Sequence, residues 1–254
     1  WSSFYPWPIS ALGRWQERWT LRRYRRTSFW TGCQFTCDQL RALGVESVTP
    51  ISYGVDTEAL AELDERPLIE PLRLIVVSRL APNKRVDHAI KAVGQLREHG
   101  VKSVLRIVGD GQEREALGRL VDEQKLQTEV EFAGRLTETE KDAALREAHL
   151  LLHTSVREGW GLNVTEANAM GTPAVVYPVP GLEESTLHGE TGLVSERESP
   201  ESLAAAVQSV LRNSEDYQQW RVAGRDRARS LHWDNVLPRA CDQLEAWAGA
   251  IPFD

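Results

Sequence analysis

Residues 72–108, LRLIVVSRLAPNKRVDHAIKAVGQLREHGVKSVLRIV, carry the strongest fold signal in the chain. Leu72–Val77 and Val104–Val108 are short apolar runs, and Arg85–His99 between them has apolar side chains at helical spacing. A strand, a helix and a second strand in this order require a crossover connection, which joins parallel strands. The stretch therefore predicts the first unit of a parallel α/β sheet.

The same alternation continues along the chain. Helices are predicted at Glu113–Lys125, Glu138–Glu147 and Leu162–Met170, and again near 201–212, 215–230 and 233–248; strands are predicted at Val130–Ala133, Leu150–His153, Ala174–Tyr177 and Leu193–Val194. Helices between parallel strands cover both faces of the sheet. We therefore predict a Rossmann-like α/β domain over residues 72–212, followed by C-terminal helices over 213–254.

Residues 1–71 have a different pattern. Strands are predicted at Ser28–Thr36 and Val48–Ile51, with a short helix at Cys37–Leu43 between them. Residues 57–71 are polar and predict a linker, so residues 1–56 are expected to be the end of a preceding, partial domain. Because the sequence starts at Trp1 and not at methionine, we expect the natural start to lie upstream.

Composition narrows the possible partners. The net charge of −7 argues against a general nucleic-acid binder, which needs a basic surface. No apolar run approaches the roughly 20 residues that a membrane-spanning helix needs. The three cysteines, Cys33, Cys37 and Cys241, complete no metal site and are expected to be reduced and buried, as in a cytoplasmic protein.

The loops that follow the strands hold the candidate site, because parallel sheets bind ligands beyond the carboxyl ends of their strands. After Leu72–Val77 come Ser78, Arg79 and Lys84, just before a predicted helix. Cations and a helix amino terminus act on the same negative charge and suit a diphosphate. An ordinary surface loop with solvated cations is the alternative.

The loop after Leu150–His153 is the most informative. Its sequence, SVREGWGLNVTE over residues 155–166, places Glu158 in a glycine-rich turn and Glu166 in the following helix. Carboxylates accept hydrogen bonds from two hydroxyls, so Glu158 suits a sugar and Glu166 a ribose diol. The alternative is a capped helix with surface acids. Further candidates for ligand contact in this loop are Ser155, Gly159, Gly161, Leu162 and Asn163.

The other strand-end loops are weaker evidence, because tight turns without a ligand explain their glycines equally well. Gly109 and Gly111 alone leave a nicotinamide-dependent dehydrogenase as an alternative, although the third glycine of that fingerprint is missing. The candidates for ligand contact in these loops are Gly109, Gly111, Gly134, Arg135 and Glu184.

Taken in order, four segments resemble glycosyltransferase family 4. They are VVSRLAPNKRVDHAI (76–90), IVGDGQE (107–113), SVREGWGLNVTEANAMGTPAVV (155–176) and PGLEE…HGETGLV (180–194). The resemblance covers Leu72–Val194, and Pro180 stands where the family usually has the first of two glycines. It implies a GT-B fold of two facing Rossmann-like domains, of which residues 72–212 would be the second.

The resemblance also implies an activity: retaining transfer of a sugar from a nucleoside-diphosphate sugar to an unidentified acceptor. Arg79 and Lys84 would bind the diphosphate and stabilise the charge on the leaving group. Glu158 would hold the donor sugar, and Glu166 the ribose. Because the family generally needs no divalent metal and the chain lacks an Asp-x-Asp cluster, we expect neither a metal nor a cofactor.

One departure keeps a second function open. The family's first domain carries a glycine-rich loop and a histidine, and neither occurs in residues 1–71. The alternative function is therefore a non-catalytic nucleotide-sugar-binding subunit without a complete acceptor domain.

The segment 1–30 has two interpretations of its own. Gly13–Arg26 carries six arginines against one glutamate, interleaved with Trp15 and Trp19. Such a helix can lie on the anionic inner face of a membrane. It can equally pack its tryptophans against the remainder of the first domain, which is the interpretation we favour.

Overall fold

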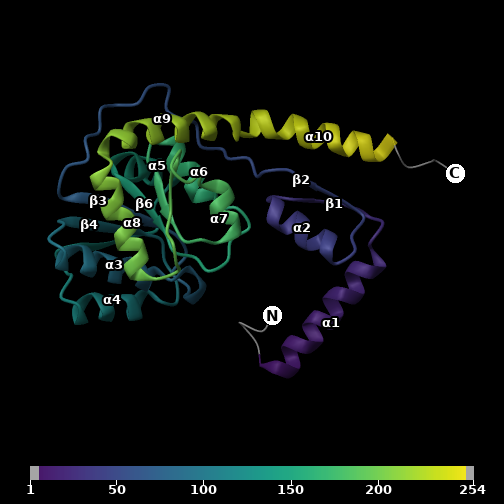
Figure 1. Cartoon of the computed structure of the whole chain (residues 1–254), viewed down its shortest axis with the longest axis horizontal. Helices are drawn as coiled ribbons and strands as arrows, with labels where there is room; N and C mark the ends of the chain where they lie inside the picture. The colour runs from purple at the N-terminus through teal and green to yellow at the C-terminus, as the bar shows by residue number, and fades with distance from the viewer. Residues whose placement is uncertain (1–5, 250–254) are drawn as a thin grey trace. The chain divides into compact units, whose positions relative to one another are not determined.

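The computed structural model describes residues 6–249, which form two compact units (Figure 1). The first comprises residues 53–236 and contains the large sheet; the second comprises 6–52 together with 237–249. Residues 57–71 and 213–236 thus group with the sheet unit. Parts of the predicted segments 1–30 and 213–254, namely residues 1–5 and 250–254, lie outside the described residues.

Six parallel strands form the sheet, in the order β5-β4-β3-β6-β7-β8. This confirms the predicted parallel α/β fold. The order reverses between β3 and β6, because the chain moves outward through β4 and β5 and then returns to the other side of β3. The strands are β3 (Leu72–Val77), β4 (Ser103–Val108), β5 (Val130–Gly134), β6 (Leu150–His153), β7 (Ala174–Val176) and β8 (Gly192–Val194).

Helices cover both faces of the sheet (Figure 1). Since crossovers between parallel strands are right-handed, the reversal of direction moves the helices to the opposite face. One face carries α3 (Val86–Glu98), α4 (Arg114–Glu123) and α8 (Pro200–Arg212); the other carries α5 (Glu138–Glu147), α6 (Leu162–Ala169) and α9 (Ser214–Ser230). The central strands β3 and β6 are therefore covered on both sides, which explains why they are apolar apart from Arg73 and His153.

Two further helices, η1 (Pro82–Lys84) and α7 (Pro180–Ser185), lie in loops of the sheet unit, and a third, α10 (Trp233–Gly249), follows α9. The segment of α7 was expected to be a loop. It forms a short helix because Pro180 occupies the first helical position, where the missing N–H has no cost.

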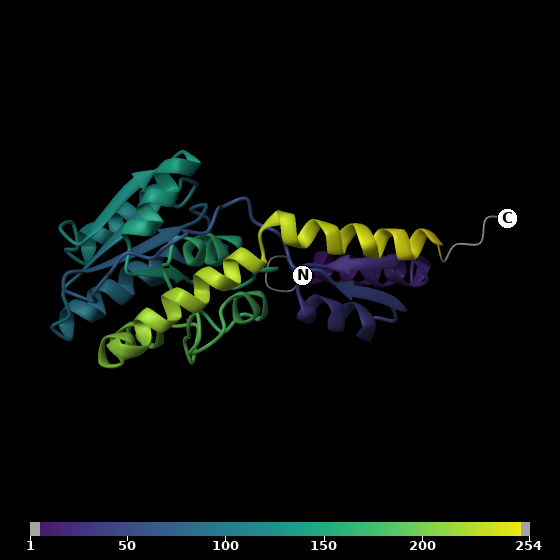
Figure 2. The same ribbon diagram turned by 90° about the horizontal axis from the view of Figure 1, so that it is seen from above.

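The second unit contains α1 (Trp7–Arg23), β1 (Ser28–Thr31), α2 (Gln34–Ala42), β2 (Ser47–Pro50) and the end of α10. Strands β1 and β2 pair in parallel, and α2 packs along them (Figure 2). Strand β1 is shorter than the predicted Ser28–Thr36 because α2 begins at Gln34.

The side chains of this unit divide sharply between inside and outside. Trp7, Trp15 and Trp19 of α1 are exposed. Cys33 and Cys37 are buried as expected, but the expectation was wrong for Cys241, which is exposed because it follows the buried Ala240 by about 100° around α10. No helix among residues 6–249 is long and apolar enough to cross a membrane.

The polar segment 57–71 is fastened to the sheet unit by buried hydrogen bonds. Arg66 is buried and donates to the carbonyl oxygen of Ala148 and to Thr172 Oγ1, both at 2.8 Å. The backbone N–H of Leu60 donates to the carbonyl oxygen of Ala169 at 3.0 Å. These hydrogen bonds fix the backbone of residues 60–66 against the sheet unit.

A buried histidine predicts how stability changes with pH. His149 Nδ1 accepts a hydrogen bond from the backbone N–H of Arg73, and burial together with the charges of Arg73, Arg66 and Arg221 lowers the pKa of His149 to about 4. The folded state thus binds fewer protons than the unfolded state between pH 6.5 and about 4. We expect His149 to lower the free energy of unfolding by roughly 2 kcal/mol between pH 7 and pH 5.

The measurement is urea denaturation at both pH values for the unchanged chain and for His149→Asn, which retains a hydrogen-bond acceptor but does not titrate. The variant should lose roughly 2 kcal/mol less over this interval. Equal losses in the two chains would show that His149 is not the group responsible.

Candidate functional site

A cavity of about 580 Å³ lies at the carboxyl ends of β3 and β6, where the strand order reverses. Open α/β sheets bind ligands at this switch point. The loops after β3 and β6 supply most of the lining, together with the start of α6. The lining residues are Tyr53, Val77, Ser78, Arg79, Lys84, His153, Glu158, Gly159, Trp160, Gly161, Leu162, Asn163 and Glu166.

Hydrogen bonds to backbone carbonyl oxygens hold the two loops against each other. Thr154 Oγ1 lies 2.9 Å from the carbonyl oxygens of both Lys84 and Arg85. The N–H of Val156 donates to the carbonyl oxygen of Asn83 at 3.1 Å. Because these bonds join the end of η1 to the loop after β6, they bring the predicted cation and the predicted carboxylate into one site.

Lys84 and Glu158 form an ion pair in the cavity. Lys84 Nζ donates to Glu158 Oε1, and the two side chains are only 21% and 17% exposed. Burial alone would raise the pKa of Glu158, but the hydrogen bond from Lys84 and the charge of Lys84 bring it below its ordinary value. Glu158 is therefore a carboxylate at neutral pH and can accept hydrogen bonds from hydroxyl groups.

His153 is a lining residue that was not predicted. Its Nε2 atom lies 3.6 Å from Glu158 Oε1, and burial lowers its pKa to about 4, so its ring is neutral at neutral pH. The available sequence signal was a polar residue at the end of the otherwise apolar run LLLH. Tyr53, Val77 and Trp160 also line the cavity without having been predicted.

The amino terminus of α6 faces the cavity. Gly161 has φ +90°, and a Cβ at this position would lie 2.8 Å from Leu182 Cδ2, so glycine is required here. The helix then starts at Leu162. In its first turn the Val164 N–H donates to the Gly161 carbonyl oxygen at 3.0 Å, whereas the N–H groups of Leu162 and Asn163 have no acceptor within the helix. Asn163 lines the cavity, but its side-chain Nδ2 donates to the carbonyl oxygen of Val77 at 2.7 Å and ties α6 to β3.

The segment PGLEE (180–184) packs against the backbone of the loop that follows β6. A Cβ at Gly181 would overlap the carbonyl oxygen of Glu158, so only glycine lets α7 pack this closely. Glu184 is not among the described lining residues; its carbonyl oxygen accepts a hydrogen bond from Arg227 Nη2 at 2.6 Å.

The structure does not bring the remaining predicted residues to the described cavity lining. A Cβ at Gly109 would overlap the Ser78 carbonyl oxygen, and the Gly109 N–H donates to the Gly134 carbonyl oxygen at 2.7 Å. Close packing behind the β3 loop thus accounts for Gly109, and Gly111 lies equally close to the backbone of Leu80. Ser155 is buried, and the Arg135 side chain is 82% exposed.

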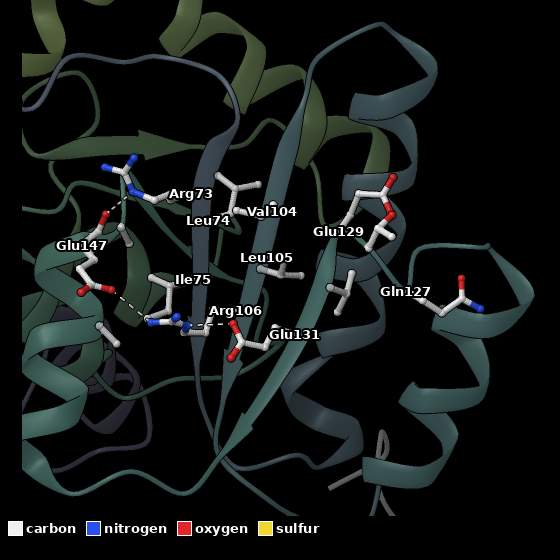
Figure 3. Close-up of a pocket in the computed structure, with 14 residues that line it drawn as sticks. Arg73, Leu74, Ile75, Val104, Leu105, Arg106, Gln127, Glu129, Glu131 and Glu147 are labelled. Carbon is white, nitrogen blue, oxygen red and sulfur yellow. Dashed lines mark hydrogen bonds and ion pairs between the residues drawn. The ribbon is translucent and has the colours of Figure 1, made fainter.

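A second cavity, of about 280 Å³, lies over β3, β4 and β5 beside α5. Figure 3 shows Arg106 between Glu131 and Glu147, with ion pairs of 3.2 and 3.3 Å. None of the predicted site residues lines it. Because the switch-point cavity is the one lined by Arg79, Lys84, Glu158 and Glu166, it remains the candidate site.

Comparison with known proteins identifies the family of this chain. Residues 63–227 match the model of the family "Glycosyl transferases group 1". The chain therefore belongs to this family, and the dehydrogenase alternative is set aside.

Two relatives illustrate the range of the family. The chain is 33% identical over 194 residues to a glycogen synthase of Mycobacterium tuberculosis, which covers 76% of this chain and 47% of that protein. It is 28% identical over 204 residues to a D-inositol 3-phosphate glycosyltransferase of Corynebacterium glutamicum, covering 74% and 49%. The chain thus spans about half the length of these relatives.

Two solved structures illustrate the similarity of fold. Anabaena Alr3699/HepE, solved in complex with UDP and glucose, has a TM-score of 0.75 at 18% identity, covering 90% of this chain and 67% of that one. Sucrose-phosphate synthase from Thermosynechococcus elongatus has a TM-score of 0.74 at 22% identity, covering 87% and 58%. These likenesses establish the GT-B type of fold for the sheet unit.

Proposed function

We propose that this chain is the donor-binding half of a retaining glycosyltransferase, which transfers a sugar from a nucleoside-diphosphate sugar to an acceptor. The observation that carries the proposal is the charge distribution of the switch-point cavity. Arg79 and Lys84 come from the loop after β3, whereas Glu158 and Glu166 come from the loop after β6 and from α6. Cations and two separate carboxylates match a molecule with a diphosphate between two polyols.

Each residue then has a chemical role in this proposal. Arg79 and Lys84 bind the diphosphate and stabilise the negative charge that develops as it leaves. Glu158, held ionised by Lys84, accepts hydrogen bonds from the hydroxyls of the donor sugar. Glu166 accepts hydrogen bonds from the ribose diol, and the N–H groups of Leu162 and Asn163 at the start of α6 face the phosphate or the sugar.

We also propose that transfer is independent of a divalent metal, because two basic side chains provide the countercharge to the diphosphate. Chelation by EDTA should then leave donor binding unchanged. Retention of the anomeric configuration follows from the family resemblance. NMR of the sugar released by slow hydrolysis of the donor tests this proposal. The anomer that appears first should have the same configuration as the sugar in the donor.

The first experiment is a calorimetric titration of this chain with UDP, GDP and ADP and with their glucose or mannose conjugates. One base should be bound selectively, and Arg79→Ala should weaken binding at least about tenfold, because a charge-assisted contact to phosphate is lost. Arg119→Ala is the control, since this side chain is 67% exposed on α4, and it should bind as the unchanged chain does. Absence of binding, or equal binding by Arg79→Ala, would refute the proposed donor site.

The alternative, a non-catalytic nucleotide-sugar-binding subunit, shares the same cavity. Donor turnover separates the two functions: the subunit would bind the nucleotide sugar and neither transfer nor hydrolyse it.

A further inference from the structure

Lys141 of α5 is buried beside the proposed ribose carboxylate. Its side chain is 11% exposed, and Nζ lies 3.1 Å from Glu166 Oε2 and 2.5 Å from Glu138 Oε2. Glu138 is on the same helix as Lys141, whereas Glu166 is on α6. Lys141 therefore joins two helices through an ion pair that ends at a lining residue of the switch-point cavity.

The ion pair has a direct consequence for Glu166. A free glutamate side chain has several rotamers, and ordering it on ligand binding reduces affinity. Lys141 holds one carboxylate oxygen and so orders the side chain before the ligand arrives. A carboxylate has lone pairs to spare on both oxygens, so the group can still accept hydroxyl protons.

The surroundings of Lys141 keep it charged. Burial alone would lower the pKa of Lys141, but the hydrogen bonds and charges of Glu138 and Glu166 raise it above its ordinary value. Lys141 is not among the described lining residues, so it acts through Glu166 and not by touching the ligand.

We propose that Lys141 is a positioning residue that holds Glu166 ready for the 2′,3′-diol of a ribose, and that this pair makes the site prefer ribonucleotides to 2′-deoxyribonucleotides. The inference rests on the proposed function, because it assumes that Glu166 meets the ribose.

The test compares UDP, GDP and ADP with their 2′-deoxy counterparts by calorimetric titration of the full chain. In Lys141→Met the ribonucleotide should bind about tenfold more weakly, because an ordered, charge-assisted acceptor is lost. The 2′-deoxyribonucleotide, which lacks one hydroxyl, should lose distinctly less. Lys141→Arg, which keeps the charge, should retain the ribose preference.

Glu166→Gln provides the matched background. In Glu166→Gln the preference for the ribonucleotide over the 2′-deoxyribonucleotide should already be reduced. Adding Lys141→Met to this variant should not reduce the preference further, since both substitutions remove the same interaction. If Lys141→Met does not fold, Lys141→Gln serves in its place, because it keeps a donor but removes the charge.

Three outcomes would overturn the inference. Equal weakening of ribo- and deoxyribonucleotides would assign Lys141 a structural role between α5 and α6. An unchanged preference in Lys141→Met would show that Glu166 needs no positioning. Absence of nucleotide binding by the unchanged chain would refute the proposed function itself. This result is distinguishable from the other two, because it is seen in the unchanged chain and not only in the Lys141 variants.

Discussion

Replacement of Lys84 by alanine should weaken binding of the nucleoside diphosphate by about a hundredfold, because two charge effects act together. The substitution removes a cation that the diphosphate would meet. It also removes the ion-pair partner of Glu158, whose side chain is only 17% exposed. An unpaired carboxylate in this position repels the incoming phosphates, and burial then raises the pKa of Glu158.

The double variant Lys84→Ala/Glu158→Gln separates the two effects. It should recover about tenfold of the lost affinity, because the repulsion is gone while the cation is still missing. Calorimetric titration measures the nucleotide affinity of the unchanged chain, the two single variants and the double variant, which together form a double-mutant cycle. Nucleotide binding by Lys84→Ala at the affinity of the unchanged chain would show that Lys84 does not meet the diphosphate.

The largest loss of stability is expected from Arg221→Leu in α9. The Arg221 side chain is fully buried and donates to the carbonyl oxygen of Gly171 at 2.9 Å, to that of Asp64 at 2.7 Å and to Asp64 Oδ1 at 2.9 Å. Leucine removes these three donors, and among the described residues only the longer bonds from Arg66 to Asp64 Oδ1 (3.3 Å) and to the Gly171 carbonyl oxygen (3.4 Å) remain. We expect the free energy of unfolding to fall by about 3 kcal/mol.

Arg212→Leu is the matched control, because Arg212 is an exposed arginine at the end of α8. It should change the free energy of unfolding by less than about 0.5 kcal/mol. Urea denaturation followed by circular dichroism measures both variants. Similar small effects in the two chains would mean that the contacts of Arg221 contribute little to stability.

The sequence predicted the strands and helices of the sheet unit closely. Glu138–Glu147 and Leu150–His153 agree with the structure at both ends, because the periodicity of apolar residues is a local property. It also predicted that the loops after β3 and β6 hold the functional residues, since each loop carries its charged groups in a short stretch. The helix at Pro180 was missed, because six residues are too few to show a helical period.

Other features of the site were beyond local patterns. Whether Gly109 touches a ligand or packs against Ser78 depends on the distance between two loops, and no spacing in the sequence contains that distance. His153 appeared as the last residue of a strand, and only the turn of the following loop brings Glu158 to within 3.6 Å of it.

The sequence by itself therefore determined the class of fold, the identity of its elements and the charged loops that follow the strands, because neighbouring residues along the chain encode all three. Only the tertiary structure decided which loops meet. The reversal of strand order places β6 beside β3, so that Lys84 reaches Glu158, and the packing of α5 on α6 brings Lys141 to Glu166. Contacts of this kind depend on how crossovers and helices pack across the whole domain.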